Sequence, residues 1–135
     1  MDYLLIVSHR LFTLIHFLSF LAAIAIVFYI FWGADSDLAL TTLHLNPPYD
    51  KLLHLSVYGS IAFLFRSSGI LKMSFLVWCI VVVVGALDEL HQMNIIGRTA
   101  ALDDLAADAF GAMLGLILYW LFIRYWVSRR VVILD

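Results

Sequence analysis

Charged residues are scarce in this chain. Of its 135 residues, 13% are charged and 64% are hydrophobic, whereas a soluble domain carries about a quarter charged residues. This scarcity excludes an ordinary water-soluble domain, because so apolar a surface needs hydrocarbon as its main solvent. The formal net charge of −2 also lacks the basic excess with which nucleic-acid-binding domains contact phosphates. We therefore predict a protein of the lipid bilayer that does not bind nucleic acid.

Cysteine and proline are rare as well. The single cysteine, Cys79, lies inside an apolar run, so an intrachain disulfide is excluded and the thiol is interpreted as a small buried hydrophobe. Both prolines fall within residues 34–50. Because proline interrupts helices and restricts the residue before it, this segment is expected to connect two helices.

Long apolar runs fill most of the remaining chain. A membrane-spanning helix needs about 20 apolar residues to cross about 30 Å of hydrocarbon. The first run has no charge and lacks a strongly basic leader, so we expect an uncleaved span rather than a signal peptide. The second run is the shortest. The sequence predicts an all-α, four-helix transmembrane bundle, a single membrane domain of residues 1–135, with spans at 11–33, 50–66, 72–92 and 104–124.

Lysine and arginine are unevenly distributed over the predicted connections. With four spans, both chain ends share a side with the connection at residues 66–72, and six of the eight basic residues lie there. Eight of the ten acidic residues lie on the other side. Because basic residues favour the cytoplasmic face, we predict cytoplasmic termini and an acidic side that faces outward.

Polar residues gather at the predicted outer ends of the last three spans. Helical spacing places three sets of polar residues each on one face of a helix. The sets are Asp50, His54 and Tyr58; Asp88, His91 and Gln92; and Asp104 and Asp108. Ionisable groups inside spans cost about 2.5–3.5 kcal/mol each and usually face the bundle interior. We therefore predict one outward-facing polar pocket, formed by Asp50, Lys51, His54, Asp88, Glu89, His91, Gln92, Arg98, Asp104 and Asp108.

Some of these acids have simpler interpretations. Acids at a helix start cap free N–H groups and complement the helix dipole, which is the role assigned to Asp103 and the alternative for Asp104 and Asp50. Asp108 lies one turn deeper than a cap. Asp88 ends a helix, where negative charge is disfavoured. Those last two residues therefore need another explanation.

Two further features concern packing. Gly111 and Gly115 form a small-xxx-small pattern that lets helix backbones approach closely, either within the bundle or in a homodimer. His16 lies in the middle of the first span, and we interpret it as a hydrogen-bonded packing residue rather than a ligand.

The polar residues, taken with their spacing, resemble the VanZ-like membrane proteins. The family pattern DExhQxxxpgRsxxxxDxxxNxxGxxxG resembles residues 88–115, and its DKxxH...Y element resembles residues 50–58. The resemblance implies a multi-pass protein of the bacterial cytoplasmic (inner) membrane, in a family associated with glycopeptide (teicoplanin) resistance. Asp108 stands where the family usually has asparagine, which adds a negative charge or a proton. Ile96 replaces a frequent proline, which leaves that loop less rigid.

Three functions are compatible with the pocket. In the first, Lys51 and Arg98 bind an anionic lipid-linked, cell-envelope or glycopeptide ligand, since arginine can hold phosphate or carboxylate through two parallel hydrogen bonds. In the second, the protein is a membrane enzyme acting on a cell-envelope lipid. In the third, it is a structural or accessory subunit in which an ion-pair network of Asp88, Arg98 and Asp104 holds a loop. A transporter is least favoured, because the spans are few.

The enzyme hypothesis assigns catalysis to His54, His91 and Asp88. One histidine would act as general acid or base, oriented by Asp50 or Asp88. No serine or cysteine is adjacent to either histidine in the sequence, so the reaction would use activated water rather than a covalent intermediate.

A divalent cation is compatible with the carboxylates of Asp88, Asp104 and Asp108, which are hard oxygen ligands suited to magnesium or calcium. Zinc is disfavoured by the sequence, because three ligands with a familiar spacing are not found.

Overall fold

The protein is a bundle of helices. The structure, a computed structural model, describes residues 2–33, 48–94 and 101–131. Within these ranges the helices are α1 (Asp2–Gly33), α3 (Tyr49–Ser67), α4 (Ser74–Gln92) and α5 (Leu102–Val131), and the described residues contain no strand. The prediction of an all-α fold with four helices is confirmed.

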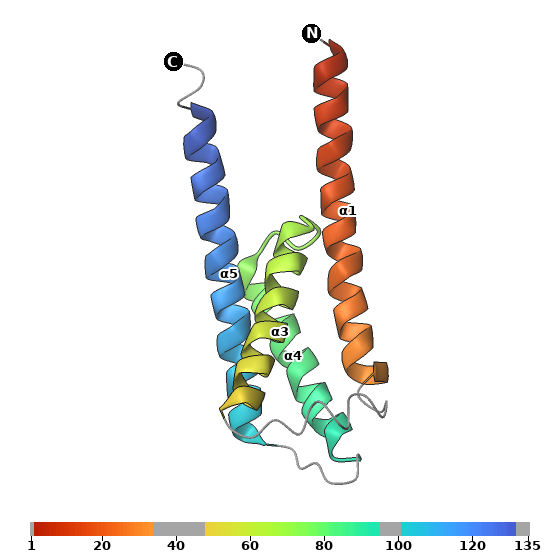
Figure 1. Ribbon diagram of the computed structural model, residues 1–135, viewed down its shortest axis with the longest axis vertical. Coiled ribbons are helices and arrows are strands. Elements are labelled where there is room, and N and C mark those ends of the chain that lie inside the picture. The colour runs from red at the N-terminus through yellow and green to blue at the C-terminus, as the bar shows by residue number, and fades with distance from the viewer. Residues whose placement is uncertain (1, 34–47, 95–100, 132–135) are drawn as a thin grey trace.

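Neighbouring helices run in alternating directions. Figure 1 shows that the start of α1 and the end of α5 lie at the same end of the molecule, where both helices extend beyond α3 and α4. The start of α3, the end of α4 and the start of α5 share the opposite end. The polar segments of three helices are thereby brought to one level. Which end faces the cytoplasm stays a prediction from the distribution of basic residues.

Three of the helices are long and apolar enough to cross a membrane by length and composition. These candidate spans are Arg10–Gly33, Ser74–Gln92 and Leu102–Trp126. Large apolar side chains cover their outer surfaces; Trp32, for example, is 73% exposed and Phe75 71%. Contiguous apolar surface of this kind is rare on soluble monomers and is matched by lipid tails.

Helix α3 is not among those three spans. It has 19 residues and carries Asp50 near its start and Arg66 in its last turn. Because α3 packs against α1, α4 and α5, less of its surface meets lipid, and it need not be apolar all round. Its crossing of the membrane, expected for residues 50–66, stays a prediction.

Glycines bring α3 and α5 into backbone contact. A Cβ atom on Gly111 would clash with the backbone of Leu55, and one on Gly115 would clash with the backbone of Gly59. The small-xxx-small pattern therefore packs against α3 of the same chain, as small residues do in membrane bundles. The contact with α3 therefore accounts for Gly111 and Gly115 without a homodimer.

Helix α3 contributes half of the residues of the hydrophobic core, and α1, α4 and α5 contribute the others. The fully or nearly buried members of the core are Ala23, Tyr58, Ile61, Ala62, Phe65, Val77, Val81 and Ala112.

The far end of α3 is closed by a short turn. Gly69 has a φ of +70°, a conformation that glycine adopts at little cost and that commonly ends helices. The His16 Nδ1 atom lies within hydrogen-bonding distance of the Ser67 carbonyl oxygen. His16 thus joins α1 to this turn, in the packing role expected from the sequence.

Candidate functional site

Three buried carboxylates define the polar end of the bundle. Asp88 and Glu89, in the last turn of α4, are 4% and 5% exposed, and Asp108, in the second turn of α5, is fully buried. Carboxylates are almost never so buried unless they are paired. The hydrogen-bond and ion-pair partners of these carboxylates are therefore the first evidence of the function of this end of the bundle.

Tyr58 and Gln92 donate hydrogen bonds to the carboxylate of Asp88. The Tyr58 hydroxyl of α3 donates to Asp88 Oδ2 at 2.9 Å, and the Gln92 side-chain amide, one turn along α4, donates to the same oxygen at 3.0 Å. These bonds offset the unfavourable position of an acid at a helix C-terminus. Asp88 and Gln92 lie together as their spacing predicted.

Glu89 connects the end of α4 to the start of α5. Its Oε2 atom accepts a hydrogen bond from the Ala101 backbone N–H at 2.8 Å, immediately before the first residue of α5. Free N–H groups and the positive end of the dipole at a helix start favour such a carboxylate. The other oxygen, Oε1, is buried and has no hydrogen-bond partner among the described residues.

Asp108 pairs with His54. The His54 Nδ1 atom lies 2.9 Å from Asp108 Oδ1, and the His54 side chain is 14% exposed. Gly85 of α4 provides the space for this carboxylate, since a Cβ atom there would come within 2.6 Å of Asp108 Oδ2. The sequence hypothesis assigned Asp50 or Asp88 to orient the catalytic histidine, but the carboxylate that pairs with His54 is Asp108.

Lys51 lies at the rim of the cluster between two acids. Its Nζ atom pairs with Asp103 Oδ2 and, at 2.9 Å, with Asp104 Oδ1. Asp103 and Asp104 lie in the first turn of α5, so they combine the expected position at a helix start with an ion pair to α3. Asp50 makes a local contact instead, because its Oδ1 accepts the Lys51 backbone N–H at 2.8 Å.

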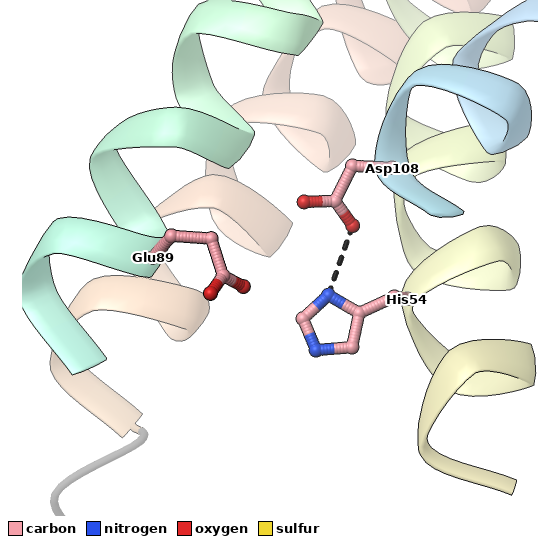
Figure 2. A group of neighbouring side chains, drawn as sticks. All are labelled: His54, Glu89 and Asp108. Atoms are coloured by element: carbon pink, nitrogen blue, oxygen red, sulfur yellow. Dashed lines mark hydrogen bonds and ion pairs between the residues drawn. The ribbon is translucent and has the colours of Figure 1, made fainter. Parts of the chain in front are cut away.

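His54, Glu89 and Asp108 form a potential metal-binding group. One ligand atom from each lies within 4.8 Å of the other two. Figure 2 shows the three side chains converging from α3, α4 and α5 on a common space. The cation site predicted from sequence combined Asp108 with Asp88 and Asp104, but among the described residues this group unites Asp108 with a histidine and a glutamate instead.

One predicted site residue lies apart from this group, and another falls outside the described residues. The His91 ring is half-buried and packs beside Phe31 of α1, with ring centroids 5.8 Å apart, and it is not part of the His54 group. Arg98 lies outside the described residues, as do Gly97 and the rest of residues 95–100.

Sequence reasoning assigned no role to Gly85 or Ala101. Gly85 is a glycine in an apolar run, three residues before Asp88. A glycine in a membrane helix often marks a close approach, so that signal was present. The bond from the Ala101 backbone had no sequence signal, because any residue type except proline supplies the same N–H.

Comparison with known proteins agrees with this architecture. The model of the VanZ/LLP1 family matches residues 3–123. The chain belongs to the VanZ/LLP1 family. No curated protein and no solved structure matches it. The VanZ/LLP1 match contains every residue of the polar cluster and confirms the resemblance drawn from the sequence. Together with the three apolar helices, it identifies a multi-pass membrane protein.

Proposed function

We propose that this VanZ/LLP1 protein binds the anionic headgroup of a lipid-linked cell-envelope compound at the outer face of the bacterial cytoplasmic membrane. The observation that carries the proposal is the position of Lys51, whose partly exposed ammonium group lies at the rim of the polar end beside Asp103 and Asp104. Binding without chemical conversion is the primary role. Its proposed consequence for the cell is a contribution to glycopeptide (teicoplanin) resistance.

Buried charged groups contribute little net stability to the packing of helices. Replacing buried ion pairs by well-packed apolar side chains is often neutral or stabilising by about 1–4 kcal/mol, and ionisable residues at membrane depth are usually functional. Glu89 Oε1 and Asp108 Oδ2 have no hydrogen-bond partner among the described residues. These two oxygens are therefore available to accept hydrogen bonds from a bound ligand.

A cation for an anionic headgroup lies at the rim of the cluster. The Lys51 side chain is 36% exposed, and its contacts with Asp103 and Asp104 keep the ammonium group at this end of the bundle. Arg98 is the second cation that the sequence assigns to the pocket, and it lies outside the described residues. A phosphate bound at the rim would be neutralised by these two side chains.

An apolar groove beside the cluster suits a lipid tail. It lies between α4 and α5, has a volume of ≈ 280 Å³, and is lined by Ala86, Glu89, Leu90, Ala101, Leu102 and Leu105. Five of these six residues are apolar. A hydrocarbon chain in this groove would have its headgroup at the polar end of the bundle.

The test is a binding titration with two matched lipids. A fluorescent polyprenyl phosphate is titrated into the purified protein in detergent, and the polyprenol with the same fluorophore is the control lipid. We expect saturable binding of the phosphate and much weaker binding of the alcohol. Lys51→Gln and Arg98→Gln should each weaken phosphate binding about tenfold or more, since a hydrogen bond to a charged group contributes about 1.5–3 kcal/mol.

Lys72→Gln is the matched control, because Lys72 is an exposed lysine just before the start of α4, whereas the polar cluster lies at the end of that helix. It should leave the titration unchanged. Identical curves for the two lipids, or for Lys51→Gln, Arg98→Gln and the unmodified protein, would refute the proposal. At the level of the cell, expression in a susceptible host should raise the inhibitory concentration of teicoplanin, and Lys51→Gln should abolish that rise.

A membrane hydrolase is the second candidate, and the pairing of His54 with Asp108 favours it. A carboxylate that accepts from one ring nitrogen orients the imidazole, so that the other nitrogen can act as general base toward water. Of the two candidate bases, His54 and His91, this pairing favours His54. In a phosphate-release assay with a polyprenyl diphosphate, turnover should be lost in His54→Asn and kept in His91→Asn. Absence of release with the unmodified protein, with and without divalent metals, would eliminate this function.

A further inference from the structure

We infer that His54, Glu89 and Asp108 form a binding site for a divalent transition-metal ion, with zinc as the ion that fits best. This site is distinct from the headgroup contacts proposed for Lys51 and Arg98. It combines an imidazole nitrogen with two carboxylates, one residue from each of three helices.

The geometry is close to that of a metal site. Zinc bonds to nitrogen and oxygen are about 2.0–2.2 Å long, so neighbouring ligand atoms in a tetrahedral site lie about 3.3–3.6 Å apart. His54 Nδ1 and Asp108 Oδ1 are already 2.9 Å apart, and all three ligand atoms lie within 4.8 Å of one another. The 4.8 Å limit exceeds the separation in a tetrahedral site by about an ångström, so a shift of that size by one carboxylate completes the geometry.

The charge of the cluster favours a cation. Glu89 and Asp108 are 5% and 0% exposed, and each has one buried oxygen without a hydrogen-bond partner among the described residues. A buried anion needs a counter-charge. Two carboxylates with a neutral histidine carry two negative charges, which one divalent ion neutralises.

Neighbouring groups hold two of the ligands in position. Glu89 Oε2 accepts the Ala101 backbone N–H at 2.8 Å, which leaves Oε1 available to a metal ion. Gly85 packs against the Asp108 carboxylate and restricts its rotation. Metal sites commonly rely on such outer contacts to orient their ligands.

The donor set selects the class of ion. Imidazole nitrogen suits zinc and other transition metals, whereas magnesium prefers six oxygen ligands in an octahedron. Three protein ligands leave a fourth position on zinc open, as in catalytic zinc sites. That position would accept water or an oxygen atom of a ligand. The three ligands come from separate helices, so no short spacing of the zinc type exists in the sequence.

The test uses the metal alone, so its outcome is independent of any lipid. Full-length protein without a polyhistidine tag is stripped with a chelator in detergent and titrated with Zn²⁺ against a chromophoric competitor. We expect one equivalent of tightly bound zinc, confirmed by elemental analysis, and at least a tenfold weaker response to Mg²⁺. The melting temperature of the unmodified protein should rise with zinc concentration, because the ion binds the folded state.

Three variants remove one ligand each with little change of shape: His54→Gln, Glu89→Gln and Asp108→Asn. Each should lower zinc affinity at least tenfold and lose the zinc-dependent rise in melting temperature. Two control variants should keep the zinc affinity and the zinc-dependent rise in melting temperature. They are His16→Gln, which changes a histidine far from the group, and Asp103→Asn, which changes an exposed carboxylate. Circular dichroism shows whether each variant is folded. Absence of saturable zinc binding to the unmodified protein, or full binding by three folded ligand variants, would overturn the inference.

Discussion

Gly85 of α4 lies directly against the carboxylate of Asp108 on α5. A Cβ atom at residue 85 would come within 2.6 Å of Asp108 Oδ2 and 3.1 Å of Asp108 Cβ. The absence of a side chain at residue 85 is therefore what allows a fully buried aspartate to reach His54. The polar cluster depends on this apolar position as much as on its own charged residues.

We predict that Gly85→Ala disrupts the contact between Asp108 and His54. The added methyl group forces the carboxylate to move, so zinc affinity should fall at least tenfold, and overpacking should lower the free energy of unfolding by about 1–3 kcal/mol. Zinc titration and thermal unfolding in detergent measure the two effects. Val83→Ala, at an exposed position of the same helix, is the control and should change neither. A variant with normal zinc affinity would contradict the prediction.

Tyr58→Phe should destabilise the bundle. The substitution removes the hydroxyl that donates to Asp88 Oδ2 at 2.9 Å in a buried setting, which costs about 1.5–3 kcal/mol when the partner is charged. Denaturation in mixed detergent micelles gives the free energy of unfolding. Tyr119→Phe is the matched control, because the Tyr119 hydroxyl accepts a long bond of 3.5 Å from Arg66. Equal losses for the two variants would show that the Tyr58 bond is unimportant.

Gly115→Leu should separate α3 from α5. A Cβ atom at residue 115 already clashes with the Gly59 backbone, so a larger side chain forces the helices apart and removes their close contact. We expect a loss of more than about 3 kcal/mol of stability, at the upper end of overpacking effects. Met113→Leu, at a position 42% exposed, should be nearly neutral. Monomer folding and oligomeric state are both followed by size-exclusion chromatography, and an unchanged fold with loss of a dimer would assign the glycines to a homodimer instead.

In metal-free protein, Asp108→Asn should raise the melting temperature. It removes one of the three buried carboxylates, while the asparagine oxygen can still accept a hydrogen bond from His54. Functional sites often carry groups whose removal is stabilising. Asp104→Asn is the comparison and should cost about 0–1 kcal/mol, since it weakens a partly exposed ion pair with Lys51. A loss of about 3–5 kcal/mol for Asp108→Asn would indicate a structural ion-pair network.

The orientation in the membrane can be tested with single cysteines. In a Cys79→Ala background, Asp103→Cys should react in intact cells with a maleimide that does not cross membranes, because the start of α5 is predicted to face outward. Ser128→Cys, near the other end of α5, should react after permeabilisation alone. Both positions are exposed. The reverse pattern would place the polar cluster on the cytoplasmic side.

The sequence by itself determined the fold class and the composition of the polar end. Uncharged runs of membrane-spanning length require helices, because each backbone polar group in hydrocarbon must be satisfied within its own segment. Alternating helix direction then placed Asp50 to Tyr58, Asp88 to Gln92 and Asp104 to Asp108 at one level. Helical spacing was enough to bring Gln92 to Asp88, since they are one turn apart.

The tertiary structure alone decided which of these groups meet. Helical periodicity gives the face of a helix on which a residue lies, but the rotation of one helix against another depends on packing at glycines such as Gly85 and Gly111. For that reason the partner of His54 proved to be Asp108 rather than Asp50 or Asp88. The group of His54, Glu89 and Asp108 spans 54 positions of the chain, and no local spacing rule connects residues whose proximity is created by the packing of three helices.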